Sequence, residues 1–385
     1  MFKLIWSFSL GVLLIACSSE SGKNTGASVG SSEPELGGEK EAFYYGADLS
    51  YVNEMQDCGA TYYNKEGKAM DPYQIFAQAG TNLVRFRLWH DPSWGEYSGF
   101  EDVRRSISRA KAQGLPVLLD FHYSDTWADP ERQLVPKAWK AEVNNTAVLG
   151  DSVYQYTYKT LLKLGDMGLL PDMVQVGNET NVMILQDDMK EGPINWTRNA
   201  FLFNKGIEAV RDISLKYEKE VGIMLHIAQP ENAIRWFKDA VANGITDFDW
   251  IGISYYPLWS EYPLEELGGA LSSLKETYQK RIMIVETAYP YTMANADAAN
   301  NILGEEALLP GYPATPKGQY DYLKRLARII KAADGGGLVY WEPAWVTTNC
   351  RTQWGQGSHW DNATLFDQRG KAHLGMQFYA EAKND

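Results

Sequence analysis

Two glutamates follow apolar segments of the sequence, where a carboxylate is expected only if it has a structural or chemical role. Glu179 closes the run Val176-Gly177-Asn178-Glu179, and Glu286 lies in Ile284-Val285-Glu286-Thr287. Burial of an unpaired carboxylate in such apolar surroundings costs several kcal/mol. Either glutamate alone could be a structural partner of an arginine. Two carboxylates that flank one space could instead cleave a glycosidic bond, because one protonates the leaving oxygen while the other attacks the anomeric carbon or activates water.

The elements that would position these glutamates form a regular series. From residue 44 onward, short segments rich in Val, Ile, Leu and Tyr alternate with segments of helical period. The predicted strands are 44–50, 82–89, 116–123, 172–179, 222–229, 249–257, 281–290 and 336–345. The predicted helices include 101–113, 152–167, 195–217, 234–242, 264–278 and 317–333. Eight β-then-α repeats predict one (β/α)8 (TIM) barrel domain over 42–385, since a doubly wound sheet usually has fewer strands and no linker interrupts the segment.

The connections between these elements are unequal in length. Helix-to-strand links are short, as at 80–81 and 114–115, whereas long stretches follow the first, third, seventh and eighth strands. Long loops without secondary structure are usually functional. In a (β/α)8 barrel the loops after the strands build the active-site face. Glu179 and Glu286, which end the fourth and seventh strands, are therefore expected to face the same central space.

Composition and charge exclude several classes of function. The chain has 36 Lys+Arg against 49 Asp+Glu, a net charge of −13, and no basic run beyond short pairs, so a nucleic-acid partner is not expected. The five histidines lack the paired spacing of a metal hydrolase, and no Walker-type or dinucleotide fingerprint occurs. Aromatic residues make up 13% and include 13 Trp. Such rings fill cores and also suit sugar faces, and both uses remain open.

The N-terminus has the features of a processing signal. Lys3 precedes an apolar stretch too short to span a bilayer, and Leu14-Ile15-Ala16-Cys17 resembles a bacterial lipoprotein cleavage site. Residues 1–16 are the predicted signal peptide, with Cys17 as the lipid-bearing N-terminus, and a plain secretory signal is the alternative. Residues 17–41, poor in large apolar side chains, are a predicted flexible tether. This resemblance implies a lipoprotein of the outer membrane or cell surface of a Gram-negative bacterium, facing outward or into the periplasm, with membrane contact only through the lipid.

Longer motifs surround the two glutamates throughout the chain. In order they are Gly46-Ala47-Asp48, Val84-Arg85-Phe86-Arg87-Leu88-Trp89, Asp120-Phe121-His122-Tyr123-Ser124-Asp125-Thr126-Trp127-Ala128-Asp129-Pro130, Gly177-Asn178-Glu179, Ser254-Tyr255-Tyr256-Pro257, Val285-Glu286-Thr287 and Tyr340-Trp341-Glu342-Pro343-Ala344-Trp345. On these motifs the sequence resembles clan A of the glycoside hydrolases and, within it, family 53, the endo-β-1,4-galactanases. The resemblance implies a retaining enzyme that cuts internal bonds of β-1,4-galactan and needs no cofactor for catalysis, and a monomer is expected. A clan A enzyme acting on mannan or glucan, and a non-catalytic glycan-binding lipoprotein, are the alternatives.

The resemblance also gives roles to the residues at the two carboxylates. Glu179 would be the general acid and then the base, and Glu286 the nucleophile, about 5–5.5 Å apart as in retaining enzymes. The charge of Glu286 is expected to raise the pKa of Glu179. The clan's pattern places an arginine of the second strand beside the nucleophile. Arg85 is favoured for this position over Arg87, which shares its strand face.

Further residues are expected to hold the substrate. Tyr255 would donate its hydroxyl to Glu286, and Asn178 would bond the sugar 2-hydroxyl. Trp341 is expected under the sugar at the cleavage point, with Trp127 and Trp345 as outer stacking platforms, although a core position is the alternative for each ring. The remaining candidates for bonds with galactose hydroxyls are Asp48, His122, Asp125 and Asp361.

The loop after the seventh strand contains a possible metal motif. Asn295, Asp297 and Asn301 have the odd-position spacing of a calcium loop, and some members of the family carry calcium in the corresponding loop. Because the segment has one carboxylate, a plain polar loop is the alternative.

Two cysteines follow neighbouring strands of the expected barrel. Cys58 comes after the first strand and Cys350 after the eighth. These strands are adjacent in a closed barrel, and an oxidising compartment permits a disulfide between their loops. We therefore expect Cys58 and Cys350 to be bonded.

Overall fold

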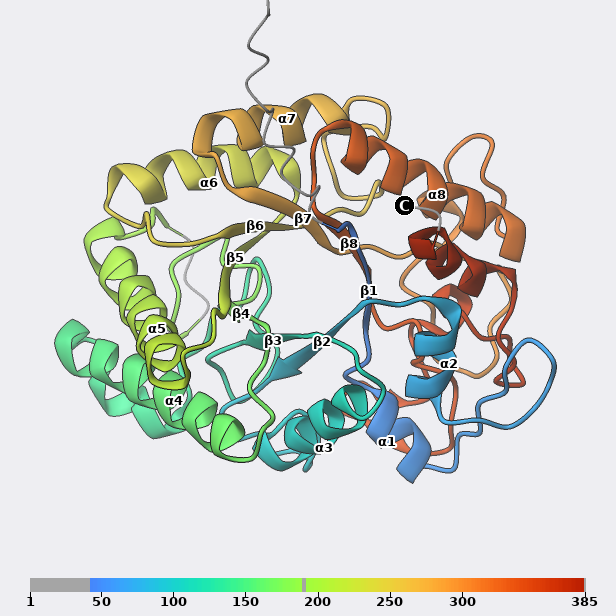
Figure 1. The fold of residues 1–385 in the computed structure, drawn as a ribbon, viewed down its shortest axis with the longest axis horizontal. Helices are drawn as coiled ribbons and strands as arrows, with labels where there is room; N and C mark the ends of the chain where they lie inside the picture. Colours follow the sequence, from blue (N-terminus) through green and yellow to red (C-terminus); the bar gives the residue numbers. More distant parts are fainter. Residues whose placement is uncertain (1–41, 189–191, 384–385) are drawn as a thin grey trace, which may run out of the picture. The chain divides into compact units, whose positions relative to one another are not determined.

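A computed structural model of the protein describes residues 42–188 and 192–383. Eight parallel strands form a closed barrel in the order β1 to β8, with β8 paired to β1 (Figure 1). Their bounds are β1 Tyr44–Asp48, β2 Leu83–Leu88, β3 Val117–Phe121, β4 Met173–Val176, β5 Gly222–Ala228, β6 Trp250–Ser254, β7 Arg281–Glu286 and β8 Gly337–Tyr340. The predicted (β/α)8 barrel is confirmed, and each predicted strand contains an observed one. The predicted signal peptide (1–16), the tether (17–41) and Cys17 lie outside the described residues.

Helices surround the barrel (Figure 1). They are α1 Val52–Asp57, α2 Pro72–Ala79, α3 Phe100–Lys111, α4 Thr146–Asp166, α5 Trp196–Tyr217, α6 Pro230–Ala242, α7 Leu267–Tyr278 and α8 Pro316–Ala332, with the 3-10 turns η1 Lys137–Glu142, η2 Glu305–Ala307, η3 Asp361–Ala363 and η4 Leu374–Lys383. Helix α4 begins earlier than the predicted residue 152. The reason is local, because the Asn145 side chain accepts a hydrogen bond from the Val148 N–H and caps the helix there.

The barrel interior has two layers along the strand direction. Toward the strand N-termini lies an apolar layer, which consists of Leu83, Leu118, Met173, Met224, Trp250, Met283, Val285 and Val339. Interior positions further along the strands form a polar layer, which consists of Asp48, Arg85, Asp120, Gln175, His226 and Ser254, none more than 1% exposed. Since side chains alternate with a period of two, the same strand faces that build the apolar layer also carry the polar one.

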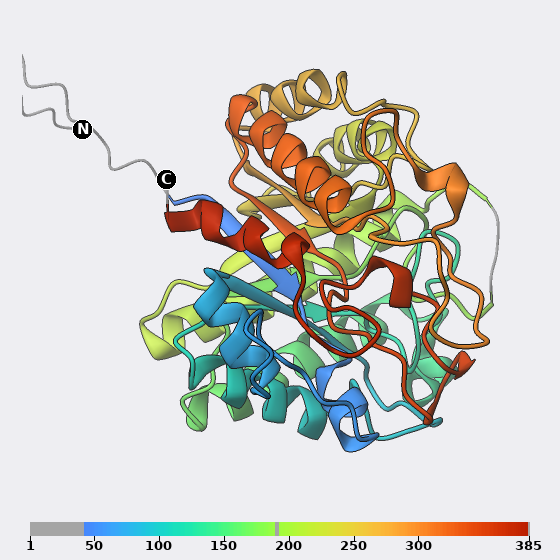
Figure 2. The same ribbon diagram turned by 90° about the vertical axis from the view of Figure 1, so that its right-hand side faces the viewer.

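The connections at the strand N-terminal end are short and tightly packed. Helix α2 ends at Gly80, whose φ of +114° lies in the region that favours glycine. A Cβ on Gly80 would lie 2.4 Å from the backbone oxygen of Tyr379, so no other residue fits without movement. Ring contacts such as Tyr45 with Phe378, 5.1 Å between centroids, hold η4 against β1. In Figure 2 these segments lie on the left and the long loops after the strands extend to the right.

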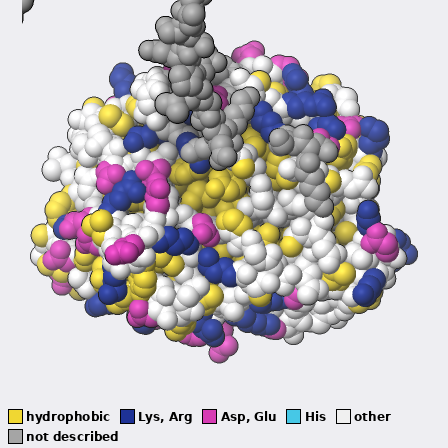
Figure 3. Space-filling view, in the orientation of Figure 1, with side chains coloured by type: hydrophobic (Ala, Val, Ile, Leu, Met, Phe, Trp, Pro, Cys, Tyr) yellow, Lys and Arg dark blue, Asp and Glu magenta, His cyan; other side chains and the backbone are white. Residues whose placement is uncertain are grey.

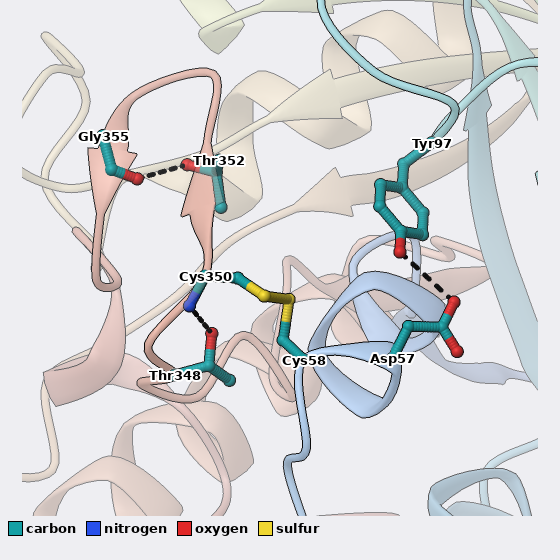
Figure 4. The surroundings of a disulfide bond; sticks show 7 residues. All are labelled: Asp57, Cys58, Tyr97, Thr348, Cys350, Thr352 and Gly355. Carbon is teal, nitrogen blue, oxygen red and sulfur yellow. Dashed lines mark hydrogen bonds between the residues drawn. A yellow bond between two sulfur atoms is a disulfide. The ribbon is translucent and has the colours of Figure 1, made fainter.

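A disulfide joins two of the long loops, as predicted. Cys58, next to the end of α1, is bonded to Cys350 with a Cα–Cα distance of 5.6 Å (Figure 4). Cys350 directly precedes an unpredicted hairpin, β9 Arg351–Thr352 and β10 Gly355–Gln356. The bond therefore fixes one end of this hairpin to the loop after β1.

On the face of the molecule drawn in Figure 3, Lys and Arg side chains are interspersed with Asp and Glu side chains. Within residues 42–188 and 192–383, no helix has the length and apolar character needed to cross a bilayer.

Candidate active site

A cleft of about 610 Å³ opens at the C-terminal ends of the strands. Both predicted catalytic carboxylates, Glu179 and Glu286, line it. The other predicted site residues that line it are Asp48, Arg85, His122, Trp127, Asn178, Trp341 and Trp345. Active sites of (β/α)8 enzymes lie at this end of the barrel, built from the loops that follow the strands.

Glu286 ends β7, and a β-bulge directs its side chain into the cleft. Val285 belongs to the apolar layer inside the barrel, so strict alternation would turn Glu286 outward. The pairing between β6 and β7 slips at this point, because Ile253 pairs with Ile284 whereas Ser254 pairs with Glu286. The extra β7 residue changes the direction of the side chain, an effect that bulges commonly have beside active sites.

Arg85 holds the negative charge of Glu286, which agrees with its predicted position. Its Nη1 lies 2.8 Å from Glu286 Oε1 and 2.8 Å from Asp48 Oδ2. Its Nη2 lies 2.8 Å from Asp120 Oδ2 and donates to Asn178 Oδ1 at 2.7 Å. A planar guanidinium with several fixed donors can orient this many acceptors at once. Arg85 therefore links the nucleophile candidate to the polar layer.

Glu179 follows β4 in a backbone conformation that is rare outside glycine. Its φ is +43°, in the left-handed region that is often found at functional sites. Its Oε1 accepts a hydrogen bond of 2.6 Å from Ser254 Oγ. Burial raises the pKa of Glu179 to about 7. A large share of the Glu179 carboxyls is therefore still protonated at neutral pH, as a general acid requires.

His226 sets the direction of the hydrogen bonds beneath Glu179. Its Nδ1 lies 3.3 Å from the backbone N–H of Glu179 and 3.0 Å from the Gln175 amide nitrogen. Asn178 Oδ1 also lies 3.0 Å from Nδ1, but the backbone N–H is a fixed donor directed at Nδ1, so Nδ1 accepts. Its Nε2 then carries the proton and donates to Ser254 Oγ at 2.8 Å. Burial, followed by the charge of Arg85, lowers the pKa of His226 well below its ordinary value, which keeps the ring neutral. Ser254 is thus left with its own proton to donate to Glu179.

Burial is the largest cause of the raised Glu179 pKa. Asp129 raises this pKa further, and the Ser254 hydrogen bond and Arg85 lower it. The repulsion expected between the two carboxyls acts on Glu286, because burial raises its pKa well above the ordinary value, Arg85 lowers it and the charge of Glu179 raises it further. Because Glu286 is the carboxyl in contact with the guanidinium, a single negative charge on the pair resides there.

The structure contradicts the predicted role of Tyr255. Its hydroxyl donates to the backbone oxygen of Tyr262 at 3.1 Å, outside the cleft. Tyr256 lines the cleft instead, and after burial the charge of Glu286 is the largest cause of its raised pKa. Ser254 faces the interior, so the period of two places Tyr256 rather than Tyr255 on that side.

One side of the cleft is formed by tryptophans of the loops after β3 and β8. We call this surface the aromatic wall, and it consists of Trp127, Trp341, Trp354 and Trp360. Ring centroids lie 6.1 Å apart for Trp127 and Trp341, and 4.6 Å apart for Trp341 and Trp360. Trp354, at the turn of the β9–β10 hairpin, is 45% exposed. Trp127, Trp341 and Trp354 are exposed enough to stack on sugar faces, whereas Trp360 is 3% exposed and packs behind Trp341.

Trp345 and Arg87 support the aromatic wall from below its exposed rings. Trp345 is 2% exposed and stacks on Tyr51 at 4.1 Å, so its predicted role as an outer platform is wrong. Arg87 forms a buried ion pair with Glu342. Its guanidinium lies 4.2 Å from the Tyr51 ring centre and 4.5 Å from that of Trp127. Arg87 therefore has a structural ion pair beneath the aromatic wall, whereas Arg85 contacts the nucleophile candidate Glu286.

Two of the expected sugar contacts lie elsewhere. Asp125 does not line the cleft, because its carboxylate accepts from the backbone N–H groups of Lys137 at 2.7 Å and Asp91 at 3.0 Å and so closes the loop after β3. Asp361 is 4% exposed and accepts from the Ala296 N–H at 2.9 Å. In both cases the carboxylate accepts hydrogen bonds from loop backbone N–H groups, so it is used to hold loops together instead of facing the substrate.

Asp361 instead joins the three residues predicted for calcium. Asn301 Nδ2 donates to Asp361 Oδ1 at 2.9 Å and also contacts Asn295 Oδ1. Thr347 Oγ1 lies 2.6 Å from Asp297 Oδ2 and 3.0 Å from Asp361 Oδ2. Carboxylate, amide and hydroxyl oxygens are ligands that calcium accepts, so the donor set fits this ion in kind. It has two carboxylates, and the described part of the chain contains no group of three or more His, Cys, Asp or Glu side chains placed to hold a metal.

Sequence reasoning gave no role to several residues that carry the site. They are Asp120, Gln175, His226 and Ser254 of the polar layer, together with Tyr256. Gln175 Nε2 donates to Asp120 Oδ1 at 2.7 Å, and His122 Nε2 lies 3.0 Å from Asp120 Oδ2. The signal was present as a single polar residue within each of the otherwise apolar strands β3, β4, β5 and β6.

A proton donor and a carboxylate nucleophile in one tryptophan-lined cleft meet the needs of glycosidic bond hydrolysis, and among barrel proteins this cleft suits a glycoside hydrolase. The sequence matches the family described as Glycosyl hydrolase family 53 over residues 44–379. The chain therefore belongs to glycosyl hydrolase family 53, which confirms the family expected from the motifs.

Known proteins of this family resemble the chain over most of its length. The arabinogalactan endo-beta-1,4-galactanase of Cellvibrio japonicus (strain Ueda107) is 56% identical over 331 residues, which cover 86% of this chain and 88% of that protein. The endo-beta-1,4-galactanase of Bacillus subtilis (strain 168) is 34% identical over 390 residues, with coverage of 90% and 87%. The solved Ignisphaera aggregans GH53 catalytic domain has a TM-score of 0.80 at 31% identity, covering 90% of this chain and 98% of that one.

Proposed function

We propose that the protein is an endo-acting hydrolase of β-1,4-galactan, as in arabinogalactan and pectic side chains, that retains the anomeric configuration. The observation that carries the proposal is the pairing of a protonated Glu179 with an Arg85-bound Glu286 in one cleft. The names of the Cellvibrio and Bacillus relatives support galactan as the substrate.

In the first chemical step, a galactosyl unit lies on Trp341 with its anomeric carbon toward Glu286. A carboxylate oxygen of Glu286 attacks that carbon while Glu179 transfers its proton to the glycosidic oxygen. The bond to the leaving sugar breaks, and a glycosyl ester forms on Glu286. Asn178 is placed in the cleft to bond the 2-hydroxyl, an interaction that strengthens in the transition state.

In the second step, Glu179 acts as a base. It takes a proton from water, and the water oxygen attacks the anomeric carbon and breaks the ester. Arg85 stabilises the carboxylate of Glu286 as it leaves. The two carboxyls thereby return to their starting protonation states, with the proton on Glu179.

The experiment that tests this function compares three polysaccharides. Purified protein lacking residues 1–41 is incubated with β-1,4-galactan, β-1,4-mannan and β-1,4-glucan, and the products are sized over time. We expect a rapid fall in the mean length of galactan alone, with oligosaccharides as early products. Absence of cleavage of galactan would contradict the substrate, and release of monosaccharide only would contradict the endo mode. Binding of galactan without any cleavage would favour a glycan-binding lipoprotein.

We also propose that the enzyme is anchored to a bacterial membrane by lipid on Cys17. The support is the sequence alone, from the apolar segment and the Leu14-Ile15-Ala16-Cys17 site. Cells fed a labelled fatty acid should incorporate label into the wild-type protein and none into Cys17→Ala, which should also leave the membrane fraction. Protease added to intact cells then separates an outward-facing from a periplasm-facing enzyme.

A structural calcium ion between the loops after β7 and β8 completes the proposal. Asn295, Asp297, Asn301 and Asp361 would hold it, and the bound ion would join the two loops. A chelator should lower the melting temperature of the wild-type protein, and added calcium should restore it. Asp297→Ala should lose this response. A melting temperature that is unchanged by chelator and by calcium would identify the loop as a plain polar one.

A further inference from the structure

The cleft extends beyond Glu179, across the barrel mouth from the loops of β1 and β8. Ala228 and Gln229, at the end of β5, and Asn232 of α6 line this part. In a closed barrel of eight strands, β5 lies opposite β1. The aromatic wall comes from the loops after β3 and β8, so the β5 end forms a separate side of the cleft.

Gln229 has three features that its neighbours lack together. Its backbone has φ +66° and ψ 140°, a conformation that is strained for a residue other than glycine. Its side chain is 7% exposed, and its Oε1 is buried without a hydrogen-bond partner among the described residues. It also lines the cleft. Gln229 therefore contributes little to the stability of the fold, because a glycine would adopt this backbone conformation without strain and would leave no amide unpaired.

Gln229 is connected to the general acid, Glu179, through hydrogen bonds of Ser254. The Gln229 N–H donates to the backbone oxygen of Ser254 at 3.0 Å, and Ser254 Oγ donates to Glu179 Oε1 at 2.6 Å. Gln229 therefore lies on the side of the site where the protonated oxygen leaves. The leaving sugar carries the oxygen that Glu179 protonates. The hydroxyls of this sugar are therefore the nearest hydrogen-bond partners for the Gln229 amide.

A second cavity, of about 360 Å³, adjoins this side of the cleft. Asn232 lines both the cleft and this cavity. The cavity is also lined by Trp196, at the start of α5, which is partly exposed. Trp236 is 4% exposed and holds Trp196 edge-to-face at 5.4 Å. Arg235 donates to Asn232 Oδ1 at 2.7 Å and fixes the residue shared by the two spaces.

We propose that Gln229 and the cavity around Trp196 bind the galactosyl units on the leaving-group side of the cleaved bond. The inference rests on the proposed function, since it assigns part of the same polymer to this side. The Gln229 amide binds hydroxyls of the first leaving unit, and the Trp196 ring stacks on a unit further along the chain. Amides and tryptophans contribute much of the lining, and the two charged residues of the second cavity, Arg235 and Asp239, have opposite signs. Such a lining suits a neutral sugar chain.

The test compares two substrates that share the galactosyl part and differ in the leaving group. One is a β-1,4-galacto-oligosaccharide, and the other is an aryl β-galactobioside, whose leaving group is no sugar. Gln229→Ala should lower the ratio of kcat/KM for the oligosaccharide to that for the aryl substrate about fivefold, as expected for one lost hydrogen bond. Trp196→Ala should lower the ratio in the same direction. A purely structural role would lower both rates together and leave the ratio unchanged, which would overturn the proposal.

Two further variants make the result independent of folding defects. Gln229→Gly removes the amide and the backbone strain together, so it should melt at a higher temperature than Gln229→Ala and show the same lowered ratio. Leu215→Ala, a change at a 77% exposed residue on the same helix as Trp196, should keep the wild-type ratio. A wild-type ratio in Gln229→Gly would overturn the role of the amide.

The pattern of cleavage shows which sugar units of the substrate bind in the second cavity. Galactohexaose is hydrolysed in ¹⁸O-labelled water, and mass spectrometry identifies the bond that was cut. Trp196→Ala should shift cleavage toward the reducing end, because the leaving side holds fewer units; an unchanged pattern would contradict the role of Trp196. If the wild-type protein cleaves neither the oligosaccharide nor the aryl substrate, the proposed function fails, whereas cleavage with unaltered ratios in the variants overturns this inference alone.

Discussion

The two layers inside the barrel are equally buried and chemically opposite. The apolar layer, with Met224, Trp250 and Met283, fills the half of the barrel toward the strand N-termini. The polar layer, centred on Arg85, fills the half beneath the cleft and is at most 1% exposed. Apolar packing is the less costly way to fill a barrel, because buried charges lose their hydration. The polar layer is therefore best explained by the chemistry above it.

The comparison also shows how the two glutamates acquire different states. Glu286 contacts the layer through a cation, Arg85, while Glu179 contacts it through a neutral hydroxyl, Ser254. Glu286 is buried and Glu179 is half-buried, and loss of hydration alone would raise both pKa values. The layer beneath them determines which one carries the charge. If this account is right, changes in the polar layer should alter kinetics, and changes in the apolar layer should alter stability.

The largest effect is expected for the nucleophile. Glu286→Gln keeps the shape of the side chain and removes the attacking oxygen's charge, so kcat on galactan should fall about 10⁴-fold or more. The circular dichroism spectrum should match that of the wild type. Residual activity within about tenfold of wild type would show that Glu286 is not the nucleophile.

A smaller loss, dependent on the leaving group, is expected for the acid. Glu179→Gln should lower kcat/KM for galactan about 10³-fold, since the leaving oxygen then departs without a proton. With a 2,4-dinitrophenyl β-galactobioside, whose leaving group needs no proton, the loss should be much smaller. Equal losses on both substrates would contradict a role for Glu179 as the general acid.

Arg85→Lys tests the connection between the polar layer and the nucleophile. A lysine cannot reproduce the fork that touches Glu286, Asp48 and Asp120, so kcat should fall about 10²-fold with little change in the aromatic wall. Tryptophan fluorescence on titration with galacto-oligosaccharide should report nearly unchanged binding. A wild-type kcat in this variant would show that the Arg85 contacts are not needed for catalysis.

Met283→Ala makes the matching change in the apolar layer. Met283 is fully buried, and its truncation should lower the free energy of unfolding by about 2–5 kcal/mol. Well below the melting temperature, kcat and KM should stay within about twofold of wild type. Urea denaturation and kinetics on one protein preparation give both numbers. A large change in kcat or KM with an unchanged free energy of unfolding would contradict the assignment of stability to the apolar layer and of kinetics to the polar layer.

The smallest effect is the dependence of stability on pH. Glu179 has a pKa of about 7 in the folded protein against an ordinary value of 4.5, so the folded state holds a proton that the unfolded state releases. The free energy of unfolding should therefore fall as pH rises from about 4.5 to about 7. Glu179→Gln should show a shallower slope in this window. On the alkaline side, wild-type kcat/KM for galactan should decline as Glu179 ionises.

The alternation of residue types was enough to predict the barrel and the strand ends at Glu179 and Glu286. It was not enough to predict side-chain direction where regular alternation stops. Glu286 depends on a bulge in β7, and Glu179 on a left-handed backbone, neither of which periodicity reveals. The Tyr255 prediction is wrong for a different reason, because regular alternation counted from the interior-facing Ser254 does place Tyr256 in the cleft.

The loops were the other source of error, because their contacts join segments far apart in the sequence. Asp361 meets Asn301 and Thr347 of different loops, and Trp345 is stacked on Tyr51 from the other end of the chain. Residue type alone suggested sugar contacts for both. The Cys58–Cys350 pair was predictable because the barrel itself makes the loops after β1 and β8 neighbours.

The anomeric configuration of an azide product tests the central claim most directly. An aryl β-galactobioside with a good leaving group is incubated with azide and either Glu286→Gly or Glu179→Gly, and the product is analysed by proton NMR. We predict an α-galactosyl azide from Glu286→Gly, because azide replaces the missing nucleophile and inverts the centre once. We predict a β-galactosyl azide from Glu179→Gly, because azide attacks the ester formed on Glu286. A β-azide from Glu286→Gly would contradict the assignment of Glu286 as the charged nucleophile held by the polar layer.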